Sequence, residues 1–186
     1  MMHRFRLAAI LMVLLLSFQA VPAVQHESGT TDRLSLGFDK SDPGNLAFIG
    51  IIFSTQGEVE IGRIVAEITF PRQLLSFEEV RAGLPIKAIN AELSAEVRND
   101  DSNSENSVLE VVIASPTGAA IPAGTLANLT FILLPEAPTQ HIIELKNKAE
   151  AFTTDDPPEP VELSTTNGEI ESLATPALFA CFFYMH

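Results

Sequence analysis

The stretch of sequence that decides the fold is Ile64-Val-Ala-Glu-Ile-Thr-Phe-Pro71. Every second residue is apolar, which places these residues on one face of an extended strand. This inner face carries Ala66, Ile68 and Phe70. The outer face carries Val65, Glu67 and Thr69. Pro71 has no backbone N–H to donate, so it is expected to end the strand.

Similar strand signals continue on both sides of this stretch, separated by turn residues such as Ser41-Asp-Pro-Gly44. One segment, Ala88–Val97, also fits helical spacing, but its neighbours favour a strand. Asn167-Gly168 is expected to form a hairpin turn. The further predicted strands are Arg33–Phe38, Leu46–Phe53, Leu74–Val80, Ser107–Ala114, Gly124–Leu134, His141–Leu145, Val161–Leu163 and Glu169–Glu171. This series predicts an all-β fold, a single antiparallel β-sandwich of about nine or ten strands.

Four regions follow from composition. Residues 1–23 resemble a secretory signal peptide, because Arg4 and Arg6 precede an apolar run that is shorter than the ~20 residues of a membrane span. Residues 24–32 are a polar, flexible lead-in. Residues 33–172 form the sandwich. Residues 173–186 are an apolar tail, expected to be the remnant of a surface-sorting or anchoring tail. The alternatives are a truncated or frame-shifted end, or a segment that packs on the sandwich.

The charge of the chain limits its partners. Its net charge is −13, from 24 acidic and 11 basic residues, and loss of the leader would make it more negative. Such a field repels nucleic acid and anionic lipid, so no nucleic-acid partner is expected. Cys181 is the single cysteine, so the domain contains no disulfide and must be stable through its core.

The sequence carries no pattern typical of an enzyme. It lacks a glycine-rich phosphate loop, a Gly-x-Ser-x-Gly nucleophile turn and a His-carboxylate metal spacing. No catalytic residue and no required cofactor are therefore predicted. Two acidic loops offer oxygen ligands of the kind that calcium prefers, although neither has EF-hand spacing and both also fit plain solvated loops. Their candidate ligands are Asp100, Asp101, Asp155 and Asp156.

Aromatic content bears on sugar binding. The chain has no Trp, and its one tyrosine, Tyr184, lies in the tail. The phenylalanines of the domain fall mostly at apolar, alternating positions and are expected in the core. They are Phe38, Phe48, Phe53, Phe70, Phe77, Phe131 and Phe152. This composition disfavours an aromatic platform for sugar rings.

The order of these segments resembles the cohesin-like β-sandwich family, which also contains carbohydrate-binding modules. Three motifs carry the resemblance: Phe70-Pro71-Arg72-Gln73-Leu74-Leu75, which lacks the family's aspartate, Gly124-Thr-Leu-Ala-Asn-Leu-Thr-Phe131, and Asn167-Gly168-Glu-Ile170. The resemblance implies a secreted or cell-surface, non-catalytic module that attaches to a protein partner of dockerin type. In cohesins the dockerin lies on one sheet face and carries the calcium. The alternative is a carbohydrate-binding module of a polysaccharide-degradation system.

The outer face of two strands is the predicted partner site. On Ser107–Ala114, the residues expected to point inward are Leu109, Val111 and Ile113. The residues predicted to contact the partner are Val65, Glu67, Thr69, Val108, Glu110 and Val112. Exposed valines on adjoining strands are unusual on a bare solvated face, which favours an interaction surface. The alternative is that the tail or a loop of the same chain covers them.

Overall fold

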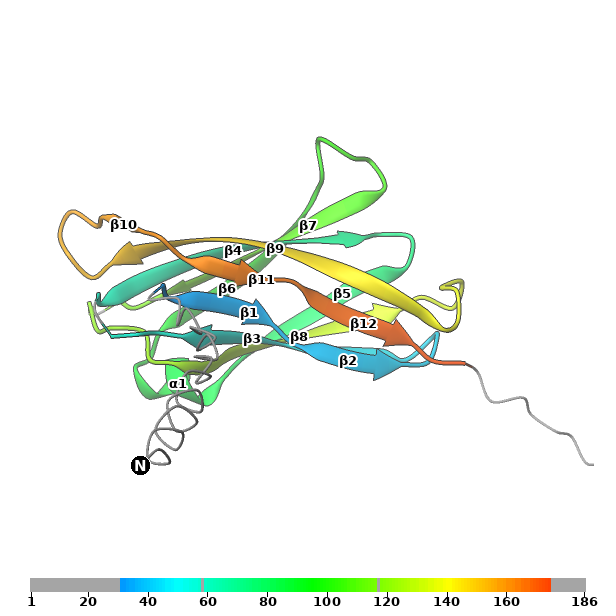
Figure 1. Ribbon diagram of the computed structural model, residues 1–186, viewed down its shortest axis with the longest axis horizontal. Helices are drawn as coiled ribbons and strands as arrows, with labels where there is room; N and C mark the ends of the chain where they lie inside the picture. Colours follow the sequence, from blue (N-terminus) through cyan, green and yellow to red (C-terminus); the bar gives the residue numbers. More distant parts are fainter. Residues whose placement is uncertain (1–30, 58, 117, 175–186) are drawn as a thin grey trace, which may run out of the picture.

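The computed structural model describes residues 31–57, 59–116 and 118–174, in which twelve strands and one short helix occur (Figure 1). The predicted signal peptide and most of the predicted lead-in and tail lie outside these residues. The strands are β1 (Arg33–Leu36), β2 (Phe38–Ser41), β3 (Leu46–Ser54), β4 (Ile61–Pro71), β5 (Leu75–Ala82), β6 (Glu92–Asn99), β7 (Asn106–Ala114), β8 (Gly124–Leu133), β9 (His141–Thr153), β10 (Pro160–Val161), β11 (Ser164–Thr166) and β12 (Gly168–Ser172). The helix is α1 (Leu84–Ala88).

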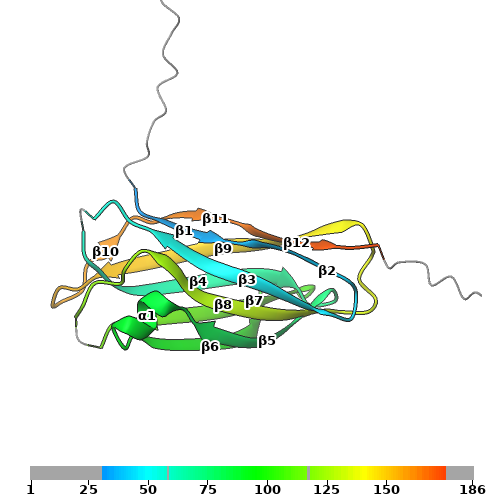
Figure 2. The same cartoon turned by 90° about the horizontal axis from the view of Figure 1, so that it is seen from below.

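The strands form two sheets packed face to face (Figures 1 and 2). The five-stranded sheet has the order β11-β1-β3-β8-β5, and the seven-stranded sheet has the order β2-β12-β9-β4-β7-β6, with β10 beside β9. The predicted all-β sandwich is confirmed. The purely antiparallel arrangement is wrong, because β11 pairs with β1 and β12 pairs with β2 in parallel. The strand number exceeds the prediction, because the predicted first strand divides into β1 and β2, and β11 forms between the predicted strands Val161–Leu163 and Glu169–Glu171.

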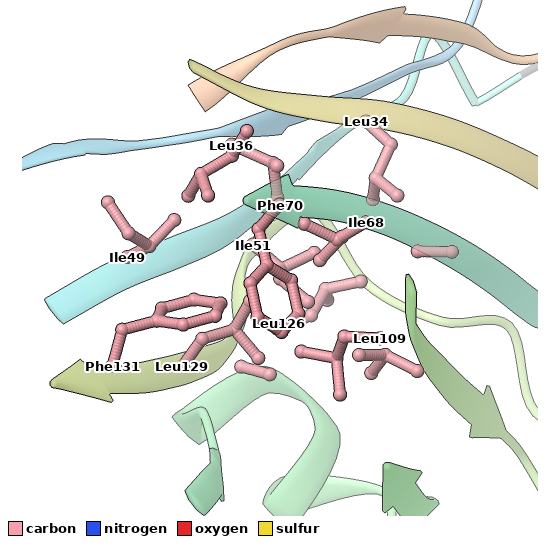
Figure 3. Close-up of a cluster of buried hydrophobic side chains, with 14 of the residues drawn as sticks. Leu34, Leu36, Ile49, Ile51, Ile68, Phe70, Leu109, Leu126, Leu129 and Phe131 are labelled. Carbon is pink, nitrogen blue, oxygen red and sulfur yellow. The ribbon is translucent and has the colours of Figure 1, made fainter. Parts of the chain in front are cut away.

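The core lies between the sheets and follows the predicted alternation. Ala66, Ile68 and Phe70 are each at most 2% exposed, and β4 ends at Pro71 as expected. Phe131, from the facing sheet, meets Phe70 and Phe77 edge-to-face, with ring centroids 5.3 and 5.7 Å apart. Figure 3 shows part of this cluster, which includes Leu34, Leu36, Ile49, Ile51, Leu109, Leu126 and Leu129.

Two phenylalanines predicted in the core lie on the surface. Phe38 is 53% exposed and Phe48 is 55% exposed. Phe38 begins β2 and leaves the sheet of β1, so the alternation of Leu34 and Leu36 does not continue through it. Phe48 is exposed because β3 has only one covered face, on which Ala47, Ile49 and Ile51 lie.

The crossing from β1 to β2 occurs at Gly37. Its N–H donates to the Gly50 carbonyl (2.9 Å), and a Cβ at this position would lie 3.2 Å from the Gly50 nitrogen. Beyond it, side chains replace the missing ladder between β2 and β3. The Asp39 carboxylate accepts the Phe48 N–H (2.6 Å), and the Ser41 hydroxyl donates to the Leu46 carbonyl (2.9 Å).

The hairpin predicted at Asn167-Gly168 is absent from the described fold. β11 and β12 belong to different sheets, and Gly168 is the first residue of β12. A Cβ on Gly168 would lie 2.6 Å from the Leu36 Cβ and 2.9 Å from the Gly37 carbonyl oxygen. The glycine is therefore required by close packing of chain segments and not by a turn.

The segment Ala88–Val97 is mainly a strand, and only its first residue belongs to a helix. α1 begins where Gly83-Leu-Pro85 was expected only to break a strand, and it ends at Ala88. β6 then begins at Glu92, so the predicted strand is confirmed for the second half. No helix in the described part of the chain has the length and apolar character needed to cross a membrane.

β9 runs to Thr153, well beyond the predicted end at Leu145, and its inner face carries a buried amide. Asn147, 8% exposed, lies on the inner face of β9. Its Nδ2 donates to the Leu34 carbonyl (3.0 Å) and the Thr166 carbonyl (3.3 Å), both in the opposite sheet. Asn147 therefore links the two sheets near the point where the last strand crosses.

We expect Asn147→Ala to lower the free energy of unfolding by about 1–3 kcal/mol, because the buried Leu34 carbonyl and the partly buried Thr166 carbonyl would lose their donor. Urea denaturation measures this change. Asn128→Ala is the matched control, since Asn128 is exposed on the outer face of β8, and we expect it to change stability by less than about 0.5 kcal/mol. Equal effects of the two substitutions would contradict the assigned role.

Candidate functional site

The candidate site is the outer face of the seven-stranded sheet, where β9, β4, β7 and β6 lie side by side. Strand register brings the six predicted residues together as three directly opposed pairs. These are Val65 with Val112, Glu67 with Glu110, and Thr69 with Val108. The predicted faces are confirmed, because the alternate residues Leu109, Val111 and Ile113 belong to the core.

Exposure differs among the three valines. Val65 and Val112 are half-buried, so each presents part of its side chain to solvent. Val108 is only 7% exposed, although it lies outside the core cluster. Its exposure was wrongly predicted. Arg98 on β6 lies opposite Val108, and the long Arg98 side chain extends across β7 to Glu67 on β4. The apolar part of the surface is therefore the Val65–Val112 pair.

A row of three glutamates crosses the sheet next to this pair. Glu67 on β4 lies opposite Glu110 on β7, and Glu110 lies opposite Glu96 on β6. Like charges directly opposite one another destabilise a sheet. The available cations gather at one end of the row, where Arg98 binds Glu67 and the Lys148 ammonium lies 3.8 Å from it. Within the described residues, Glu110 and Glu96 have no ion pair.

A shallow depression of about 190 Å³ lies between β4, β7 and β9. Its lining consists of Val65, Glu67, Glu110, Lys148, Ala149 and Glu150. Pockets for small molecules usually enclose ~300–1,000 Å³. The depression is below that range, and it suits a protruding side chain of a partner better than an enclosed substrate.

Sequence analysis missed the contributions of β6 and β9 to this face. Glu96, Arg98, Lys148 and Glu150 all point outward beside the predicted residues. The alternation of these charges with less polar residues was a usable signal. Which strands lie beside β4 and β7 was not visible in the sequence, because strand order is a property of the fold.

The candidate calcium ligands do not converge. The loop with Asp100 and Asp101 adjoins the end of β4, since Asn106 pairs with Pro71. The loop with Asp155 and Asp156 adjoins the start of β4, since Thr153 pairs with Ile61. Among the described residues, no group of three or more His, Cys, Asp or Glu side chains is arranged to hold a metal ion.

Asp100 has a local structural role. The hydroxyl and backbone N–H of Ser102 donate to its carboxylate, together with the Asn103 N–H. These hydrogen bonds lower the pKa of Asp100, and the one from the Ser102 hydroxyl has the largest effect. The carboxylate thus orders the turn between β6 and β7.

Neither the family models nor the curated protein sequences that were compared with this chain match it. Solved structures do match. The third cohesin ScaC, solved with the ScaB dockerin from Acetivibrio cellulolyticus, has a TM-score of 0.64 at 15% identity, covering 77% of this chain and 100% of its own. The sixth cohesin of scaffoldin B from the same organism, in complex with a mutant Cel5 dockerin, has a TM-score of 0.63 at 18% identity, covering 77% and 99%.

The fold is that of the cohesin domains. A non-cellulosomal cohesin from the archaeon Archaeoglobus fulgidus also matches. Its TM-score is 0.61 at 16% identity, covering 77% of this chain and 92% of its own. The cohesin-like sandwich inferred from the sequence is therefore confirmed. At these identities the likeness shows the cohesin fold alone.

Proposed function

We propose that this chain is a non-catalytic binding module that captures a protein partner of dockerin type on the outer face of β4 and β7. The observation that carries the proposal is the register that joins Val65 with Val112 and Glu67 with Glu110. The result is a partly apolar patch beside a row of charges. Protein interfaces combine these elements, with apolar contacts at the centre and polar groups around them.

The cohesin-fold structures that are named with their dockerins support a protein partner. Export or display at the cell surface belongs to the same proposal, since residues 1–23 have the composition of a signal peptide. The alternative function, a carbohydrate-binding module, has less support. Phe38 and Phe48 are exposed, but they lie on opposite sheets and so do not form one platform.

The double substitution Val65→Lys with Val112→Lys tests the surface. We expect it to weaken the binding of a dockerin by about 2 kcal/mol or more, roughly thirtyfold in affinity, because two charges would be buried at the centre of the contact. Isothermal titration with the ScaB and Cel5 dockerins named above measures the affinity.

Asn128→Lys is the matched control, since it adds a charge to the outer face of the other sheet. Unchanged dockerin affinity in a folded double variant would show that another surface binds the partner. Retention of the unaltered chain on cellulose or chitin, with no affinity for any dockerin, would favour the carbohydrate-binding alternative.

The glutamate row predicts a second effect. We expect Glu110→Gln to raise the free energy of unfolding by about 0.2–1 kcal/mol, because it removes a like charge opposite both Glu67 and Glu96. The same change should weaken the binding of a partner that places a cation against this row of glutamates. Glu105→Gln, in the exposed loop before β7, should leave both quantities unaltered. Urea denaturation and titration report the two effects, and a loss of stability in Glu110→Gln would contradict the argument.

A further inference from the structure

The outer face of the five-stranded sheet carries an exposed apolar line along β3. Leu46 is 47% exposed, Phe48 is 55% exposed and Ile52 is 39% exposed. We call these three residues the β3 stripe. The adjoining outer positions on β3 and β8 are uncharged: Gly50, Thr125, Asn128, Thr130 and Ile132. Large apolar side chains gathered on one solvated face indicate a surface that something covers.

The described chain ends next to this stripe. The Leu173 N–H, just after β12, donates to the Ser41 carbonyl (2.9 Å). The Ser41 hydroxyl in turn donates to the carbonyl of Leu46, the first residue of the stripe (2.9 Å). β2 and β12 therefore finish at the same end of the sandwich (Figure 1). Leu173, two residues before segment 175–186, is therefore linked through Ser41 to the start of the stripe.

The composition and length of segment 175–186 fit this surface. It contains no Lys, Arg, Asp or Glu, and its large apolar residues are Leu178, Phe179, Phe182, Phe183, Tyr184 and Met185. Twelve extended residues span up to ~40 Å, whereas the stripe from Leu46 to Ile52 needs about 20 Å. To follow β3, the segment would have to reverse direction soon after Ala174, and Pro176 is a residue type that favours such turns.

The other outer face near this end is a poorer fit. Phe38 and Ile142 are also exposed there, but β12 lies between their strands and presents Glu169 and Glu171. An apolar segment laid across them would remove Glu169 and the Lys40–Glu171 ion pair from water and offer no polar partner in return, which is unfavourable. Covering the β3 stripe buries no charged group on β3 or β8.

We propose that segment 175–186 packs along the β3 stripe, on the sheet opposite the partner face. The segment thereby covers exposed apolar surface of its own domain and leaves Val65 and Val112 open. This inference does not depend on the proposed function, because it concerns a different face of the sandwich.

The single cysteine provides the test. A nitroxide label on Cys181 of the full chain, with ¹⁵N detection of the backbone amides, reports which residues the segment approaches. We expect the amide signals of residues 46–52 to lose most of their intensity and those of residues 65–69 and 108–112 to keep theirs. Broadening centred on Val65 and Val112, on Phe38 and Ile142, or on no residue would overturn the proposal.

Two further samples separate this arrangement from its alternatives. The first sample mixes ¹⁵N-labelled chain that lacks the nitroxide with natural-abundance chain that carries it on Cys181. We expect no loss of amide signal in this mixture. A loss at residues 46–52 would mean that the segment of a second copy occupies the stripe. Phe48→Ser should restore the signals of the stripe, whereas Ile142→Ser, an equally exposed change on the other sheet, should not. A chain ending at Ala174 should bind the dye ANS more strongly than the full chain, and Phe48→Ser should remove that increase.

Discussion

Phe131→Ala is expected to lower the free energy of unfolding by about 3–5 kcal/mol. Phe131 is fully buried at the centre of the sandwich. Its ring meets Phe70 from the opposite sheet and Phe77 from the neighbouring strand β5 of its own sheet. Its removal leaves a cavity that the two β-sheets cannot close, because each sheet is held by its ladder of hydrogen bonds. Urea denaturation followed by circular dichroism measures the loss.

Phe38→Ala is the matched control for this prediction. Phe38 has the same side chain but is 53% exposed, and the Lys40 ammonium lies 5.6 Å from its ring centroid. We expect it to cost less than about 1 kcal/mol. A loss of similar size in the two variants would mean that Phe131 does not hold the core together.

Gly83→Ala is expected to destabilise the domain by about 3 kcal/mol, at the upper end of the usual cost of overpacking. Gly83 precedes α1 and donates its N–H to the Leu126 carbonyl (2.7 Å). A Cβ at this position would lie 1.9 Å from the Thr125 carbonyl oxygen, so β8 and the start of α1 would have to move apart. Thermal and urea unfolding should both show the loss.

Gly50→Ala is the appropriate comparison, because it also places a methyl group beside β8. The nearest atom to its Cβ, a Thr125 methyl carbon, would lie at an ordinary 3.6 Å. We expect its stability to change by less than about 1 kcal/mol. If Gly83→Ala were equally well tolerated, close approach would not explain the glycine.

Part of the candidate site on the outer face could be predicted from the sequence. Alternation alone placed Val65, Glu67 and Thr69 on one face of β4, and Val108, Glu110 and Val112 on one face of β7, because side chains alternate strictly along a strand. Alternation does not give the register between strands, since a slip of two residues preserves every face. The opposition of Glu67 to Glu110, and of Glu110 to Glu96, therefore required the tertiary structure.

Polar side chains with tertiary partners were the main source of error. Asn147 interrupts the apolar pattern of β9, which continues to Thr153 although the predicted strand ended at Leu145. The amide is acceptable in the interior only because the Leu34 and Thr166 carbonyls face it, and these residues are distant in sequence. Likewise, Asp39 and Ser41 complete the edge of β3 through contacts that no local pattern encodes.

The sequence by itself determined that the chain forms a β-sandwich, which residues of β4 and β7 face the core, and where most strands end. These properties depend on periodicity and on turn residues within one segment. The tertiary structure decided where strands cross between sheets, as at Gly37 and Gly168, and which strands pair in parallel. The physical reason is that a crossing is set by close approach between segments that meet only after folding, and sequence alternation carries no information on such contacts.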